Sequence, residues 1–228
     1  MHIRKWEELP EFMKNDQVRV YYNHLKKHQC SLFLKRCFDL IMGIVLLILL
    51  SPILIIVTIW IKLDSPGPAL FRQVRVTQYG KEFRIFKFRS MIIDAPNKGS
   101  AVTKANDDRI TKSGHFIRKT RLDELPQLLN IIVGDMSFVG TRPEVPKYVS
   151  AYTNEMKATL LLPAGVTSQT SIQFKDESAL LDGQEDVDHA YITKVLVEKM
   201  KINLEAIYQF SFLNDIKIMC QTVIAVIK

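Results

Sequence analysis

Cysteine is rare in this chain of 228 residues, where only Cys30, Cys37 and Cys220 occur. An odd number of cysteines cannot complete a disulfide framework, and these three lack the spacing of metal ligands. We therefore expect unpaired thiols in a reducing compartment. Internal repeats and low-complexity linkers are also absent, and the length suits one sizeable domain or two small ones.

The sequence also lacks the features of a secretory signal peptide. Its longest apolar run, residues 40–61, begins about forty residues into the chain and exceeds the usual signal-peptide core of roughly 7–15 residues. No small-residue cleavage site follows it, because Trp60, Lys62 and Asp64 lead directly into polar sequence. We therefore expect the apolar segment to be retained.

Nucleic-acid-binding motifs are missing too, although the formal net charge is +7. A charge of this size is compatible with simple solubility. Beside an apolar anchor it also suits an anionic membrane leaflet or an anionic substrate. We predict phospholipid and an anionic substrate as partners, and no nucleic acid.

The apolar run itself is long enough for a membrane helix, which needs roughly 20 apolar residues to cross a bilayer. Ser51 and Pro52 stand near its midpoint. Proline removes one backbone donor and clashes with the preceding turn, so it bends or breaks a helix. The Ser51 hydroxyl can satisfy a carbonyl that this break releases.

Basic residues flank the run on both sides, with Lys35 and Arg36 before it and Lys62 and Arg72 after it. Lys and Arg collect on the cytoplasmic side of membrane segments, so two basic flanks fit poorly with one exported end. The pattern favours a re-entrant helix–break–helix hairpin that returns both ends to the cytoplasm. A proline-kinked transmembrane helix and a buried core helix are the alternatives.

The remaining segments indicate a mainly helical α+β protein. Residues 1–30 are polar and basic with some helical periodicity, which predicts an accessory segment on the protein surface or the membrane. FRQVRV and KEFRIFKFRSM alternate apolar and basic residues, as in a β-hairpin with one basic face. Helices are expected from about Gly114, from Val145 or Pro146, and over 213–227, where the helix is interfacial or part of the core.

The densest chemical cluster is RKTRLDELPQ, residues 118–127. Asp123 and Glu124 could hold Mg²⁺ while nearby arginines bind phosphoryl oxygens. Thr120 and Asp123 also match a helix capping box, but that register places Pro126 beyond the first turn, where it is poorly tolerated. A cap at Leu122 or Asp123 places the proline within the first turn. A solvated salt-bridge cluster is the plainer alternative.

A second cluster, GDMSFVGTRP, carries Asp135, Ser137 and Arg142 between glycines and a proline. Such a loop could direct backbone amides and a guanidinium at a phosphate. An ordinary structural turn explains the same composition.

Several long motifs together resemble the bacterial sugar transferase family, the small monotopic phosphoglycosyl transferases that act on polyprenyl phosphate. The resemblance extends from about Lys35 to the C-terminus. Its motifs are KRCFDL, LLSPILI, IKLDSPGPALFRQVRV, FKFRSM and DDRITKSGHFIRKTRLDELPQLLNIIVGDMSFVGTRP.

The resemblance implies a re-entrant helix broken at Ser51-Pro52 and a catalytic Asp123-Glu124 dyad. The aspartate would attack the β-phosphate of a UDP-sugar, release UMP and carry the phosphosugar to polyprenyl (undecaprenyl) phosphate. Mg²⁺ is implied as cofactor, with both carboxylates as metal residues and Glu124 associated with the ion. Arg118 and Arg142 are implied as phosphate-binding residues.

Two positions depart from the family pattern. Thr141 replaces the first proline of a Gly-Pro-Arg-Pro motif, and Pro163-Ala164 stands where a basic residue and proline are common. Lys175 falls where the family often has a further basic, substrate-binding residue. The segment after Gly165 is where specificity varies, so the sequence does not identify the sugar.

These inferences divide the chain into an accessory segment (1–34), a re-entrant helix (35–63) and a cytosolic catalytic domain with short strands and interfacial amphipathic helices (64–228). The expected location is the cytoplasmic face of the bacterial inner membrane. A catalytically silent membrane scaffold is the alternative function, and the sequence leaves open whether the chain forms a homodimer.

Overall fold

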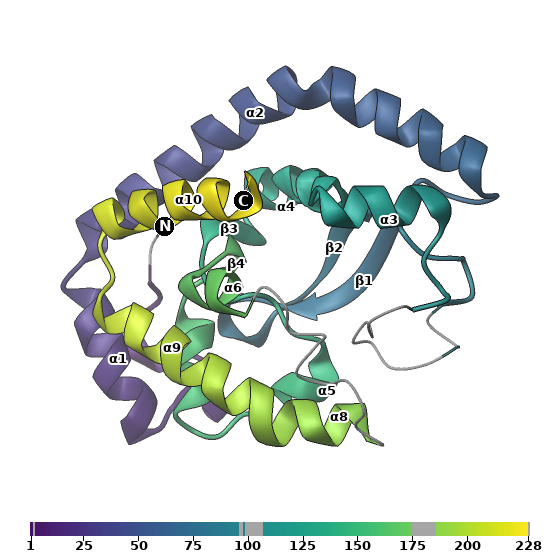
Figure 1. The fold of residues 1–228 in the computed structure, drawn as a ribbon. Helices are drawn as coiled ribbons and strands as arrows, with labels where there is room; N and C mark the ends of the chain where they lie inside the picture. The colour runs from purple at the N-terminus through teal and green to yellow at the C-terminus, as the bar shows by residue number, and fades with distance from the viewer. Residues whose placement is uncertain (2, 96–97, 99–106, 175–185, 228) are drawn as a thin grey trace.

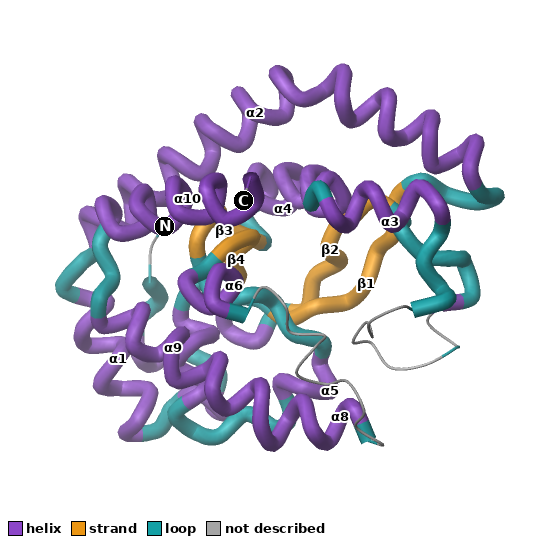
Figure 2. Tube along the Cα trace, viewed as in Figure 1, coloured by secondary structure: helices purple, strands orange, loops and turns teal. Residues whose placement is uncertain are grey.

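The computed structural model describes every residue except 2, 96–97, 99–106, 175–185 and 228 (Figure 1). The described chain is mainly helical with a few short strands, which confirms the predicted α+β class (Figure 2). The α-helices are α1 (Asp16–Lys26), α2 (Gln29–Asp64), α3 (Lys112–Lys119), α4 (Leu128–Val133), α5 (Pro146–Val149), α6 (Gln169–Gln173), α8 (Val187–Ala190), α9 (Leu196–Tyr208) and α10 (Phe212–Ile227). The strands are β1 (Leu70–Val76), β2 (Glu82–Phe88), β3 (Met136–Val139) and β4 (Ala164–Thr167). Shorter turns are the 3₁₀ helices η1 (Trp6–Glu8), η2 (Glu11–Met13), η3 (Gln78–Gly80), η5 (Leu122–Gln127) and η6 (Met156–Leu161), and a π-helical segment, η7 (Tyr191–Val195).

The apolar run lies in α2, a single helix of 36 residues. The helix continues through Pro52, so the predicted break is absent from the structure. Ser51 Oγ donates a hydrogen bond of 2.8 Å to the carbonyl of Ile48, as expected for a serine beside a proline. Figure 1 shows α2 arching over the rest of the chain, with both ends directed toward it.

Buried polar contacts fasten both ends of this arch. Near the N-terminal end, Lys35 Nζ lies 2.8 Å from the carbonyl of Val139 and 2.5 Å from Oδ2 of Asp215 on α10. At the C-terminal end, Asp64 accepts hydrogen bonds from the backbone and hydroxyl of Ser113 on α3. Both ends of the arch are therefore fixed to the rest of the chain.

The middle of α2 is long and apolar enough to cross a membrane by length and composition, and only 11% of its most apolar window is buried. Large apolar side chains such as Ile48 (66% exposed) and Leu49 (67%) face outward. A helix buried in a protein core would hide these side chains, so the core-helix alternative is wrong. In Figure 1, α10, α4 and α3 lie in a row beneath the arch and all three contact α2.

The predicted β-hairpin is confirmed. β1 pairs antiparallel with β2 from Leu70 opposite Phe88 to Val76 opposite Glu82. The second predicted turn region differs, because residues 136–139 form β3 and pair in parallel with β4. Gly134 ends α4 in the left-handed conformation (φ 97°), and the apolar residues that follow continue as a buried strand instead of a turn.

The N-terminal segment belongs to the largest buried cluster of the protein. Val18, Tyr21, Tyr22 and Leu25 recur on one face of α1 and pack with side chains of η6 and α9. The sequence indicated a surface or membrane position. In the structure, these apolar residues are instead buried against the apolar side chains of η6 and α9. The proposed division into segments 1–34, 35–63 and 64–228 remains a prediction.

Candidate active site

The predicted dyad lies on η5, directly after α3. Arg121 adopts a left-handed conformation (φ 58°) and forms the N-cap of η5, so neither of the predicted caps, Leu122 or Asp123, is correct. Thr120 ends α3, and its hydroxyl donates to the carbonyl of Phe116, so the capping-box interpretation is wrong. Pro126 is accommodated in the short 3₁₀ turn. Asp123 and Glu124 are thereby placed against strand β2.

Glu124 is held between two cations. Its Oε1 lies 2.6 Å from Nη2 of Arg142 and 3.1 Å from Nζ of Lys87 on β2. Burial alone would raise the pKa of Glu124, but the charges and hydrogen bonds of Arg142 and Lys87 lower it well below its usual range. Glu124 is therefore a fixed, ionised carboxylate.

Asp123 is buried like its neighbour but is paired more weakly. The residue is 8% exposed, and Nζ of Lys87 lies 3.9 Å from its Oδ2. Its Oδ1 is buried without a hydrogen-bond partner in the described part of the chain. Burial raises the pKa of Asp123, opposed by Lys87, while the charge of Glu124 raises it further. A desolvated, weakly paired carboxylate of this kind suits a nucleophile.

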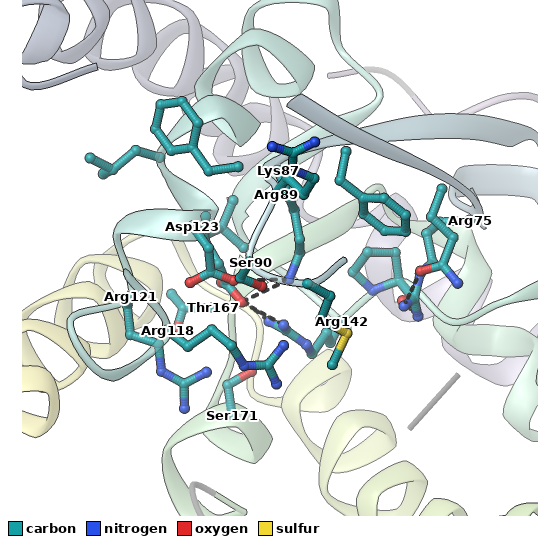
Figure 3. A pocket seen from close by; sticks show the side chains of 18 of the residues that line it. Arg75, Lys87, Arg89, Ser90, Arg118, Arg121, Asp123, Arg142, Thr167 and Ser171 are labelled. Carbon is teal, nitrogen blue, oxygen red and sulfur yellow. Dashed lines mark hydrogen bonds and ion pairs between the residues drawn. The ribbon is translucent and has the colours of Figure 1, made fainter. Parts of the chain in front are cut away.

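Both carboxylates line a cavity of about 900 Å³. Figure 3 shows Asp123, Arg118 and Arg142 directed into the same space, with Lys87 above them. The basic lining residues are Arg75, Lys87, Arg89, Arg109, Arg118, Lys119, Arg121, Arg142 and Lys199. Burial lowers the pKa of Arg118. The excess of cations over carboxylates in this cavity favours a substrate that carries phosphate groups.

Of the second predicted cluster, only Arg142 reaches the dyad. Ser137 is fully buried in β3, and Asp135 pairs with Lys81 at 2.9 Å outside the cavity. The interpretation of these two residues as part of a phosphate loop is therefore wrong. Lys175 lies outside the described residues.

The two positions that depart from the family pattern, Thr141 and Pro163-Ala164, can both be placed in the structure. The carbonyl of Thr141 accepts a hydrogen bond of 2.9 Å from the backbone of Gly165, a contact that does not depend on the side chain. Ala164 opens β4, and its backbone N–H donates to the Thr77 hydroxyl at 3.1 Å. Arg142 keeps its ion pair with Glu124 despite both departures.

Sequence reasoning did not select Lys87 or Arg75 as site residues. Both side chains belong to the hairpin face that lines the cavity, whereas Arg72 and Arg84 lie on the opposite face. The prediction of a single basic face is therefore wrong, and alternation alone could not single out Lys87 and Arg75. Sequence reasoning also missed Glu144, whose Oε1 accepts hydrogen bonds from Tyr191 at 2.5 Å and Lys199 at 3.4 Å on the cavity wall.

The next question is whether the residues of the site could hold the predicted Mg²⁺. The described residues contain no group of three or more His, Cys, Asp and Glu side chains that could hold an ion. Mg²⁺, however, commonly takes one or two carboxylates and completes its shell with water and substrate phosphates. Asp123, with its unpaired Oδ1, fits this limited requirement. Both oxygens of Glu124 accept hydrogen bonds from Arg142 or Lys87, so Glu124 would have to exchange one of these contacts for the ion.

The chain thus combines a long apolar helix with a pair of carboxylates in a cavity rich in arginine and lysine. The sequence model described as "Bacterial sugar transferase" matches residues 30–228, and the chain belongs to this family. It is 35% identical to the "UDP-glucose:undecaprenyl-phosphate glucose-1-phosphate transferase" of Escherichia coli K12, over 83% of this chain and 39% of the relative. It is also 35% identical to the "Undecaprenyl-phosphate galactose phosphotransferase" of Salmonella typhimurium LT2, over 90% of this chain and 43% of the relative.

The chain covers a larger share of a shorter relative. The "UDP-glucose:undecaprenyl-phosphate glucose-1-phosphate transferase" of Caulobacter vibrioides is 35% identical over 83% of this chain and 68% of its own length. The chain thus spans less than half of the Escherichia coli and Salmonella relatives.

Proposed function

We propose that this protein transfers a sugar-1-phosphate from a UDP-sugar to polyprenyl phosphate and thereby starts the assembly of a glycoconjugate. The observation that carries the proposal is the buried, unpaired Oδ1 of Asp123 in a cavity rich in arginine and lysine. The names of the relatives, which combine UDP-sugars or sugars with undecaprenyl phosphate, support the two substrate classes.

The reaction would proceed by two displacements at one phosphorus atom. A carboxylate oxygen of Asp123 attacks the β-phosphorus of the UDP-sugar, and the bond from that phosphorus to the bridging oxygen breaks. UMP leaves with the bridging oxygen, and the sugar phosphate remains on Asp123. A phosphate oxygen of the polyprenyl phosphate then attacks the same phosphorus, which releases the carboxylate and forms the polyprenyl diphosphate sugar.

The surrounding cations would stabilise the charge that this reaction shifts. Arg118 and Arg142 line the cavity with the dyad and can bind phosphoryl oxygens in bidentate fashion. Lys87 and Arg142 keep Glu124 ionised. Bound Mg²⁺ would neutralise phosphate charge, and we assign it to Asp123 and Glu124.

The geometry of α2 supports a location in one membrane leaflet. Its exposed apolar middle would enter the bilayer, and its arched course would return the C-terminal end toward the fastened side (Figure 1). We propose that both ends lie at the cytoplasmic face of the bacterial inner membrane, with α3, α4 and α10 near the headgroups. A soluble and a lipid substrate could then meet at one site.

Asp123→Asn tests the proposal directly. Wild-type protein in phospholipid nanodiscs is incubated with Mg²⁺ and a panel of UDP-sugars, and UMP release and the mass of the protein are measured. The wild type should release UMP and gain the mass of a sugar phosphate with one of them, whereas the variant should do neither. Asp135→Asn, outside the cavity, is the matched control. An adduct on Asp123→Asn would refute the nucleophile, and an inert wild type would favour the silent scaffold.

A further inference from the structure

The cavity that holds the dyad also has an apolar end. Leu46 and Leu50 of α2 line it together with Leu128, Ile131 and Phe138. Leu46, Leu50 and Phe138 are partly buried and pack against the buried Leu128 and Ile131. We call these five residues, with Val166 of β4, the apolar arm.

The apolar arm is continuous with the dyad through one short piece of chain. Asp123 and Glu124 lie on η5, and Leu128 and Ile131 lie on the helix α4 that follows it directly. All four residues line the same cavity. A ligand can therefore extend from the carboxylates to the underside of α2 without leaving the cavity.

The two sides of α2 differ at this point. Leu46 and Leu50 face the cavity, whereas Ile48 and Leu49 are 66% and 67% exposed on the outer side. If α2 lies in the bilayer as proposed above, the outer side contacts lipid and the inner side forms a wall of the apolar arm. The arm is then a hydrocarbon-lined space that joins membrane depth to the dyad.

The chemistry of the two ends favours one kind of ligand. The end at the dyad presents Arg118, Arg142 and Lys87, which suit a phosphate. All six side chains of the apolar arm are hydrocarbon, so they offer no partner for the hydroxyl groups of a sugar or the polar edge of a uracil. The volume of about 900 Å³ is at the upper end of the roughly 300–1,000 Å³ common for ligand sites, which leaves space for a second substrate.

We propose that the apolar arm binds the first isoprene units of the polyprenyl phosphate and directs its phosphate at Asp123. The inference rests on the proposed function, because it assigns a place to the lipid substrate of that reaction. A bilayer is about as apolar as leucine side chains, so entry into the arm gains little hydrophobic energy. The arm would act mainly by alignment, which lowers the entropic cost of the second displacement.

The test separates the two displacements. Leu50→Trp fills the arm, and Leu49→Trp adds the same side chain to the outer face of the same turn. With UDP-sugar alone, both variants should release one equivalent of UMP and form the adduct as the wild type does. With a C55 polyprenyl phosphate, the turnover of Leu50→Trp should fall at least tenfold and that of Leu49→Trp less than twofold. Equal turnover of the two variants would overturn the proposal.

A crosslinking measurement covers the case in which Leu50→Trp fails to fold. Wild-type protein is irradiated with a polyprenyl phosphate that carries a diazirine on its first isoprene units, and the labelled peptides are identified. Labels on residues 46, 50, 128 or 131 support the proposal, and labels confined to outward residues such as Leu49 overturn it. Failure of UMP release by the wild type would refute the proposed function, whereas the crosslinking pattern still reports on the arm.

Discussion

Nη2 of Arg142 lies 2.6 Å from Oε1 of Glu124, although the two residues come from separate segments of the chain. Lys87 of β2 approaches the same oxygen at 3.1 Å. Glu124 thus joins η5, strand β2 and the loop after β3, whereas the adjacent Asp123 keeps a carboxylate oxygen without a partner among the described residues. Two consecutive acids have different environments because one is neutralised by neighbouring cations and the other is mainly desolvated.

Glu124→Ala should destabilise the protein, because it leaves Lys87 and Arg142 buried together without their anion. Breaking a buried ion pair costs roughly 3–5 kcal/mol, and we expect about 3 kcal/mol here since the Arg142 side chain is 34% exposed. Chemical denaturation in detergent micelles measures the change. Glu198→Ala removes an exposed acid paired with Lys201 and should stay within about 0.5 kcal/mol of the wild type. Equal losses in both variants would contradict the assigned role.

When no Mg²⁺ is bound, the carboxyl of Asp123 should have a pKa above the usual aspartate value of about 3.9, because burial disfavours its charged form. The carboxylate is then fully ionised above the raised pKa and becomes protonated as the pH falls through it. A ¹³C NMR titration of Asp123 in EDTA-treated protein, assigned with Asp123→Asn, measures this pKa. A pKa at or below the ordinary value would contradict the proposed environment.

The sequence was sufficient for the hairpin and the apolar helix, because each has a local pattern. The assignment of Asp123 and Glu124 as a dyad came from the family resemblance, and their catalytic role remains a prediction. The alternation in β1 and β2 located the strands but not the residues that face the cavity, because basic side chains lie on both faces of the hairpin. The sequence was not sufficient to predict contacts between residues that tertiary packing brings together. Lys87 meets Glu124 across 37 positions of sequence. Ser137 was interpreted as a loop residue because Gly134 and Gly140 flank it. The residues between these glycines form strand β3, in which the side chain of Ser137 is buried.

Lys87→Met should reduce the rate of adduct formation by about 100-fold, the usual effect of removing one electrostatic contact to a transition state. The ammonium group lies near both carboxylates and lines the cavity. Lys81→Met is the matched control, since its ammonium group pairs with Asp135 and is 68% exposed. Rapid-quench measurement of UMP reports the rate. A control that loses as much activity would show that net charge, and not this position, is responsible.

Both ends of α2 should be accessible from the same side of the membrane. In a background without Cys30, Cys37 and Cys220, His28→Cys and Pro66→Cys flank the helix, and Leu49→Cys marks its outward middle. A membrane-impermeant maleimide should label positions 28 and 66 only from the cytoplasmic side of inverted and right-side-out vesicles. Position 49 should resist labelling from either side. Labelling of 28 and 66 from opposite sides would establish a spanning helix instead.

Gly165→Ala should weaken both the fold and the reaction. An added Cβ would collide with the backbone nitrogen and carbonyl of Gly140, where β3 and β4 approach, and backbone cannot move aside as a side chain can. We expect a loss of at least about 2 kcal/mol in unfolding free energy. Adduct formation should fall about tenfold, because Gly140 lies two residues before Arg142. In Gly43→Ala the added Cβ meets only side-chain atoms of Ile131 and Ile132, the nearest being Cγ1 of Ile132 at 3.2 Å, and the change should cost less than about 1 kcal/mol. Unchanged activity in Gly165→Ala would mean that the β3–β4 contact does not position the arginine.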